Sequence, residues 1–211
     1  METKKSQSLI NLKINSKVLI KDDYRTPENA IIPLLSLVPN IYTIFEPTDL
    51  NAEFKINKVF VENGYDVVCS GSSECIEKKK DNVLDYNFFD INSLDMLPKK
   101  NKPYFLVTNP PFSLKDQFIE HCLFLIETKV IEGFALLMPV STISGVTRHH
   151  YYKKAKDLGL SLTFCPFDRR IDFLLDNKNE KKSGAWFDCA WFIFDYKVNQ
   201  IDSLVFFNFI K

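Results

Sequence analysis

The chain has 211 residues, 45% of them hydrophobic and 26% charged, and its 27 basic residues balance its 27 acidic ones. This composition predicts one globular domain with a substantial core, without the basic excess of a dedicated nucleic-acid-binding protein. The apolar runs are too short to span a bilayer, and the five cysteines lack zinc-ligand spacing. We therefore expect a cytoplasmic protein with reduced thiols, no membrane segment and no metal site.

Apolar runs alternate with helical patterns along the chain. In chain order the expected elements are a helix at 26–38, a strand at 41–45, a helix around 54–60, a strand at 65–69, a strand at 104–108, a helix at 113–126, a strand at 133–139 and late strands at 185–194 and 203–209. This order predicts an α/β fold with a mostly parallel sheet, completed by a late antiparallel hairpin.

Three ranges describe the expected domain organisation. Residues 1–22 are polar and lysine-rich, which predicts a tail, and residues 23–211 are expected to form a single domain. Within it, about residues 141–184 have a weaker and more basic pattern, so we expect an inserted segment there. The polar stretch at 70–85 is predicted to be a loop or a short helix. Nothing in the sequence indicates an oligomeric state.

Two local signals define the first helix and strand. Thr26 is a good helix N-cap and Pro27 suits the first helical position, so we expect the first helix to begin there. The first strand is expected to end at Glu46 and Pro47.

The run from Tyr104 to Phe112 is the most informative part of the sequence. It reads Tyr-Phe-Leu-Val-Thr-Asn-Pro-Pro-Phe, a buried strand that Pro110 and Pro111 cannot continue. Asn109 is therefore expected at the carboxyl end of a strand, where open α/β sheets bind ligands. A planar amine could donate its hydrogens to the Asn109 side chain and the Pro110 carbonyl while Phe112 stacks on its ring. This arrangement predicts methyl transfer to an amino nitrogen; an ordinary proline turn is the alternative.

Together, three motifs are similar to those of a known enzyme family. Thr26-Pro27, Glu46-Pro47 and Asn109-Pro-Pro-Phe112 resemble, in this order, the N6-adenine DNA methyltransferases, above all the small phage-type enzymes. The resemblance covers residues 22–140 and extends weakly to Arg170–Phe173 and 185–191. It implies a Rossmann-like class I methyltransferase fold, S-adenosylmethionine as cofactor, DNA as partner and, for a phage protein, the host cytoplasm as compartment.

The resemblance also implies roles for individual residues. The catalytic loop would consist of Asn109, Pro110, Pro111 and Phe112, which would hold and stack an adenine flipped out of the duplex. Glu46 would lie near the ammonium group of the cofactor. The full set of implied cofactor-binding residues is Thr26, Pro27, Glu46, Pro47, Thr48, Ala52, Glu74 and Asp90.

The cofactor loop departs from the family pattern. Residues 48–54 contain no glycine, and Leu50 and Ala52 stand where the family favours small residues, because the backbone passes close to the cofactor. The acidic residue expected after the strand at 65–69 is replaced by Ser-Gly-Ser-Ser, with Glu74 nearby. For the acidic residue of the adenine-binding loop, Asp85 and Asp90 are the two alternatives.

Three hypotheses about function follow. The first is an active DNA adenine-N6 methyltransferase, and the second is a methyltransferase-like binding protein that has lost catalysis. The third is a methyltransferase acting on an RNA base or a protein glutamine amide. The basic clusters at 148–150 and 169–170 would contact phosphates in the first hypothesis, or form a solvated face that balances acidic neighbours.

Overall fold

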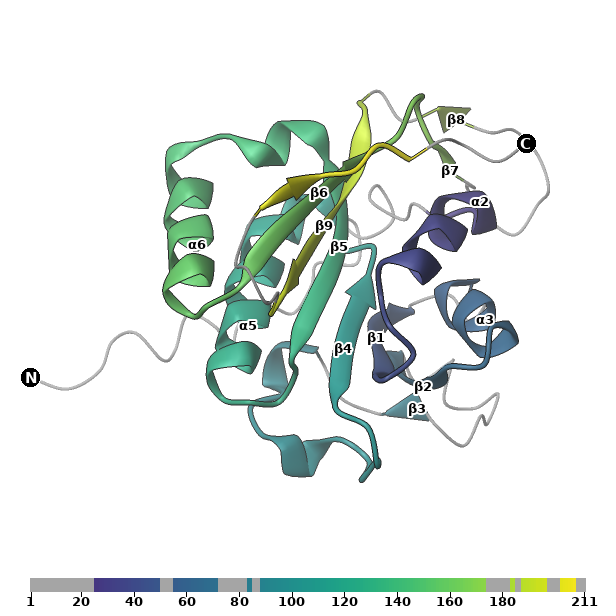
Figure 1. Cartoon of the computed structure of the whole chain (residues 1–211), viewed down its shortest axis with the longest axis vertical. Helices are drawn as coiled ribbons and strands as arrows, with labels where there is room; N and C mark the ends of the chain where they lie inside the picture. Colours follow the sequence, from purple (N-terminus) through teal and green to yellow (C-terminus); the bar gives the residue numbers. More distant parts are fainter. Residues whose placement is uncertain are drawn as a thin grey trace, which may run out of the picture.

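The computed structural model describes residues 25–49, 55–71, 83–84, 88–173, 183–184, 187–196 and 202–207. Within these ranges, eight strands form one sheet in the order β10-β6-β9-β5-β4-β1-β2-β3, with helices on both faces (Figure 1). The predicted α/β fold with a mostly parallel sheet is confirmed, since β5–β9 and β6–β9 are the antiparallel pairs among the described strands of this sheet.

The elements have the following bounds. The strands of the large sheet are β1 (Thr43–Asp49), β2 (Asp66–Gly71), β3 (Val83–Leu84), β4 (Tyr104–Thr108), β5 (Gly133–Pro139), β6 (Ser161–Pro166), β9 (Cys189–Asp195) and β10 (Ser203–Leu204). A separate pair consists of β7 (Asp172–Phe173) and β8 (Ser183–Gly184). The helices are α2 (Glu28–Ile31), α3 (Lys55–Glu62), α5 (Lys115–Glu127) and α6 (Val146–Asp157). Short 3-10 helices are η1 (Ile32–Ser36), η2 (Phe88–Asp90), η3 (Leu94–Met96), η4 (Phe112–Leu114) and η5 (Val140–Ile143).

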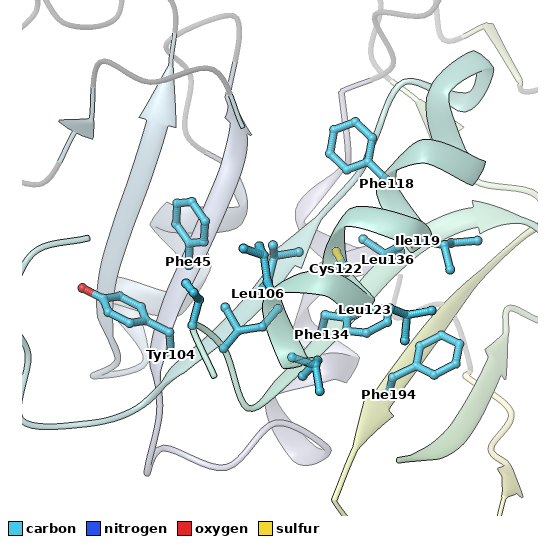
Figure 2. Close-up of a cluster of buried hydrophobic side chains, with 14 of the residues drawn as sticks. Phe45, Tyr104, Leu106, Phe118, Ile119, Cys122, Leu123, Phe134, Leu136 and Phe194 are labelled. Carbon is cyan, nitrogen blue, oxygen red and sulfur yellow. The ribbon is translucent and has the colours of Figure 1, made fainter. Parts of the chain in front are cut away.

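The central strands are buried on both faces, and their side chains alternate between two cores. In β4, Tyr104 and Leu106 belong to the core under α5 and α6, whereas Phe105 and Val107 belong to the core under α2 and α3. Figure 2 shows the first core, in which Leu106 and its neighbours from the sheet lie against apolar side chains of α5. This burial fixes the register of β4, because a shift by one residue would exchange the two faces.

The late antiparallel part of the sheet is formed by β6 and β9. β9 lies between β5 and β6 and is antiparallel to both, whereas β10 pairs with β6 in parallel, as Ser203↔Thr163 and Leu204↔Phe164. The strand predicted at 203–209 therefore does not form a hairpin with the strand before it. β9 and β10 run in opposite directions, but β6 lies between them in the sheet, so they do not pair with each other.

The first helix and the first strand differ from the expectation. Pro27, not Thr26, is the N-cap residue of α2; its backbone is extended, with ψ 151°, and no side chain caps the helix. Pro33 has no N–H to donate, and the chain continues from Ile32 as the 3-10 helix η1. β1 does not end at Pro47 but continues to Asp49, across an irregular register that accommodates the proline.

The sequence analysis did not predict β3, α6 and β6. Residues 141–184 were expected to be an inserted segment, but α6 packs on α5 and β6 forms a full ladder with β9. The helical pattern was hidden because Ala155 alone is buried in α6, the other positions being partly or fully exposed. Among the described residues, no helix is both long and apolar enough to cross a membrane.

Candidate active site

The acceptor loop, Asn109 to Phe112, follows β4 directly. β4 is paired with β5 up to Thr108↔Leu136, so the loop begins where the ladder ends. The loop is closed onto the following helix, because Leu114 N donates to the Pro111 carbonyl at 2.8 Å and Lys115 Nζ donates to the Phe112 carbonyl at 3.1 Å. Asn109 is half-buried. The structure thus places Asn109 at a rigid strand end, as the sequence predicts.

Phe112 is held in an aromatic cluster with Phe173 and Phe187. It is 7% exposed, and its ring packs edge-on against Phe187 at 5.1 Å and Phe173 at 6.1 Å between centroids. Both partners come from the late part of the chain that the resemblance reached only weakly. This part of the chain therefore packs against the acceptor loop. A base stacked on Phe112 would border the same cluster.

Glu46, Thr48 and Thr108 form a carboxylate cluster between β1 and β4. Thr108 Oγ1 donates to Glu46 Oε1 at 2.6 Å, and Thr48 donates to the same oxygen through its hydroxyl at 2.9 Å and its backbone N–H at 3.1 Å. The two hydroxyls also contact each other. Glu46 is 3% exposed and Thr108 is fully buried. The residue implied in cofactor binding is thus joined to the residue that precedes Asn109.

The sequence analysis assigned no role to Thr108, Phe173 or Phe187. Thr108 is the one polar residue in an otherwise apolar strand, and this is the signal that could have identified it. A buried hydroxyl needs a hydrogen-bond partner, and the carboxyl end of the neighbouring strand carries one. The pairing of β1 with β4 was not predictable from the sequence, because 54 residues separate the two strands.

The other predicted cofactor residues fall into two groups. Thr26 is buried and Pro27 partly buried just before α2, and this helix is fixed to β9 because Trp191 Nε1 donates to the Ala30 carbonyl at 2.8 Å. Asp90 is exposed at the end of η2. Ala52 and Glu74 lie outside the described residues, as do Leu50 and Asp85 and the predicted tail at 1–22.

Packing against α5 positions η2, which carries Asp90. Phe88 stacks on Phe118 of α5 with 4.8 Å between centroids, and it meets His121 edge-on at 4.6 Å. Burial lowers the pKa of His121 to about 4, against the opposing effects of backbone hydrogen bonds at Phe88 and Ile91 and of the Asp90 charge. His121 is therefore neutral at physiological pH and acts as part of the core.

The thiol beside the aromatic cluster is not an activated nucleophile. Cys189 packs in the same core as Phe112. Burial and, to a lesser extent, the charge of Asp188 raise the pKa of the Cys189 thiol to about 12. Because the thiolate is the reactive form, Cys189 is inert at neutral pH.

The arginines predicted to contact phosphates already have carboxylate partners. Arg148 pairs with Asp116 at 3.1 Å, and Arg170 pairs with Asp188 at 3.2 Å. Arg169 pairs with the neighbouring Asp168 at 3.1 Å. These contacts favour the interpretation of charged faces balanced within the protein. Across the described part of the chain, no group of three or more metal-ligating side chains converges.

No family model and no curated protein matches the sequence. Solved structures do match. A candidate RNA methyltransferase from Pyrococcus horikoshii is 17% identical with a TM-score of 0.58, and the match covers 94% of this chain and 100% of that one. The Type IIL restriction-modification enzyme MmeI, solved in complex with DNA, is 13% identical with a TM-score of 0.50 over 94% of this chain and 36% of the larger one. The chain therefore has the class I methyltransferase fold that the resemblance implied.

Proposed function

We propose that the chain transfers a methyl group from S-adenosylmethionine to the N6 amine of an adenine in DNA. The observation that supports this most is the position of Asn109. It lies at the carboxyl end of β4 and directly follows Thr108, whose hydroxyl donates to the buried carboxylate of Glu46. In open α/β sheets the ends of neighbouring parallel strands border one ligand site. The groups for a methyl donor and a methyl acceptor would therefore meet at this edge.

The described residues on the donor side fit the amino-acid part of the cofactor. A buried carboxylate attracts a cation strongly, because the surrounding dielectric is low. Glu46 would hold the ammonium group, and Thr26, Pro27, Pro47 and Thr48 would border the same part of the molecule. Ala52, Glu74 and Asp90 remain predicted contacts to the rest of it. When bound, S-adenosylmethionine supplies an electrophilic methyl carbon on a positively charged sulfur.

The acceptor loop would orient the amine. The Asn109 side-chain oxygen and the Pro110 carbonyl would each accept one amine hydrogen, which directs the nitrogen lone pair away from the protein. Phe112 would stack on the base, with its ring fixed by the aromatic cluster. The methyl carbon that S-adenosylmethionine would supply would bond to this nitrogen as its bond to sulfur breaks, and one amine proton would leave to water. Since Cys189 is protonated, the chain offers no thiolate there for a covalent intermediate, and positioning supplies the acceleration.

RNA is a second candidate substrate, and one finding favours it. The Pyrococcus protein, which this chain covers completely, is named as a candidate RNA methyltransferase. The same loop would hold an adenine in either polymer, because the amine and the ring are identical. A protein glutamine amide also presents a planar amine, but it has no aromatic ring for Phe112. A catalytically inactive binding protein is the remaining alternative, motivated by the glycine-free loop at 48–54.

Radiolabelled methyl transfer tests these candidates directly. The protein would be incubated with methyl-labelled S-adenosylmethionine and, separately, adenine-containing duplex DNA, single-stranded DNA and RNA, followed by nucleoside analysis. We expect labelled N6-methyladenine in DNA. Asn109→Ala should lower the rate of its formation more than about 100-fold, the effect of losing a hydrogen-bonding group aligned on the reacting atoms. Asn40→Ala is the matched control, because Asn40 lies at the opposite end of β1 and bonds Gly64 and Lys102. Label in RNA alone would favour RNA as the substrate. Transfer by Asn109→Ala at the wild-type rate would refute the proposed role of this loop for DNA and RNA alike.

A further inference from the structure

We propose that Thr108 is a positioning residue that fixes the carboxylate of Glu46 for cofactor binding and joins it to the acceptor loop. This inference rests on the proposed function, because it assigns Glu46 to the cofactor site. Thr108 itself would contact neither the cofactor nor the base. It would act through Glu46 on one side and through the backbone of Asn109 on the other.

The geometry of the carboxylate cluster carries the inference. Three donors converge on one oxygen, Glu46 Oε1, and the Thr108 hydroxyl makes the shortest of these contacts, at 2.6 Å. This hydroxyl comes from a different strand, 62 residues away along the chain, whereas Thr48 is a local partner. Thr108 therefore provides the described link between the carboxylate and β4.

Both ends of this link are rigid. Glu46 is 3% exposed and Thr108 is fully buried, so neither side chain can leave the cluster for water. Threonine is β-branched, which restricts its χ1 angle, so the hydroxyl of a buried threonine has few alternative positions. The Thr108 backbone is paired with β5 at Leu136 and leads directly into Asn109. A displacement of the carboxylate would therefore be transmitted to the acceptor loop.

A merely structural role is the competing explanation, and the chain provides a matched control for it. Thr43, in β1, is fully buried like Thr108, and its hydroxyl donates to the carboxylate of Asp66 at 3.4 Å. It lies at the amino end of the strand, away from the acceptor loop. If buried hydroxyl–carboxylate bonds only stabilise the sheet, removing either one should have the same consequences.

The experiment measures S-adenosylhomocysteine binding by calorimetry together with thermal unfolding. The variants are Thr108→Val, which is isosteric without the hydroxyl, Thr108→Ser, which keeps it, and Thr43→Val. We expect Thr108→Val to weaken binding about tenfold, the loss of one charge-assisted hydrogen bond. Thr108→Ser should stay within about threefold of the wild type and Thr43→Val within about twofold, since neither removes the hydroxyl on Glu46.

A double-mutant cycle tests the route through Glu46. Glu46→Gln keeps an acceptor oxygen for the threonine but removes the charge. If Thr108 acts by positioning that charge, Thr108→Val should change affinity less than about twofold in the Glu46→Gln background. Equal tenfold effects in both backgrounds would contradict this route. Should Thr108→Val not fold, Thr48→Val removes another donor to the same oxygen, and we expect it to weaken binding about threefold.

The outcomes separate this inference from the proposed function. If the wild-type protein binds S-adenosylhomocysteine and Thr108→Val binds it with the same affinity, the inference is overturned and the methyltransferase proposal stands. The same holds for an unchanged affinity of Thr48→Val, should only that variant fold. No binding to the folded wild-type protein overturns both. Tenfold weaker binding in Thr108→Val and Thr43→Val alike would assign the effect to general stability and also overturn the inference.

Discussion

The acceptor and donor sides of the candidate active site lie at the ends of neighbouring strands but are built differently. On the acceptor side, β4 ends in a loop that two hydrogen bonds, from Leu114 N and Lys115 Nζ, and the aromatic cluster hold in place. On the donor side, β1 runs through a proline with an irregular register, and the sequence from its end to residue 54 has no glycine. The acceptor motif is intact, whereas the donor motif departs from the family it resembles.

This difference shows that the fold holds the residues at strand ends in place, whereas the residues of the connecting segments depend on the local sequence. Each strand end is positioned by pairing with a neighbouring strand, Glu46 with Cys69 of β2 and Thr108, just before Asn109, with Leu136 of β5. Contacts made by a loop depend on its own residues, and no ladder corrects them. The carboxylate cluster joins the two strands through the Thr108 hydroxyl, so we expect a change in the cluster to affect cofactor binding and loss of the Asn109 side chain to leave it unchanged.

The largest expected effect is that Asn109 and Glu46 affect different quantities, Asn109 the rate of methyl transfer and Glu46 the affinity for the cofactor. Asn109→Ala should lower kcat more than about 100-fold while S-adenosylhomocysteine affinity stays unchanged, because only the amine contact is lost. Glu46→Gln should instead weaken cofactor binding by about 10–100-fold, because the charge that attracts the ammonium group is lost. Calorimetry and steady-state kinetics on both variants would check this. Weaker cofactor binding in Asn109→Ala would show that the two sides are not separable.

Next in size is the stability contributed by the aromatic cluster. Phe112→Ala removes a ring that is 7% exposed and packs on Phe173 and Phe187, so we expect the free energy of unfolding to fall by about 3–5 kcal/mol. The matched control is Phe206→Ala, since Phe206 is 70% exposed and its loss should change stability by less than about 0.5 kcal/mol. Urea unfolding measures both. Similar losses in the two variants would mean that the cluster does not hold the acceptor loop.

A pH titration of stability probes the contact between α5 and η2. The pKa of His121 in the folded protein is about 4, below the value of about 6.5 for an unfolded chain. Between these values the unfolded chain binds more protons. His121 therefore contributes its full stabilisation above about pH 6.5, and the contribution is lost as pH falls to about 4, by about 3 kcal/mol.

Comparison with His121→Phe isolates this contribution from that of the carboxylates. Phenylalanine has a shape similar to that of histidine, and the side chains that surround this site, Phe88, Phe89 and Phe124, are also aromatic. The difference in unfolding free energy between wild type and variant should therefore change between pH 6.5 and 4. If the difference in unfolding free energy between the wild type and His121→Phe does not change with pH, His121 is not kept neutral by burial.

The sequence allowed much of the fold to be predicted, because the apolar strands β4 and β5 are buried on both faces and leave a continuous signal. The position of Asn109 followed from the same signal and from two prolines. α6 escaped prediction because its contacts to the core are few, and the pairing of β10 escaped it because its parallel partner, β6, lies far away in the chain. The carboxylate cluster could not be predicted, since hydrogen bonds between distant strands leave no periodic pattern.

The smallest expected effect concerns the donor loop itself. If Leu50 and Ala52 crowd the cofactor, Leu50→Gly combined with Ala52→Gly should tighten S-adenosylhomocysteine binding by about three- to tenfold, because each Cβ removed permits a closer backbone approach. The same changes should lower the free energy of unfolding by about 1 kcal/mol, because glycine increases the entropy of the unfolded chain. Lys129→Gly is the control, since Lys129 already has a positive φ of 58° after α5 and glycine fits there without touching the site. Tighter binding despite lower stability would identify the loop, and not the strand ends, as the weak side of the site. Unchanged affinity would mean that the glycine-free loop is compatible with the cofactor and that the resemblance holds on the donor side as well.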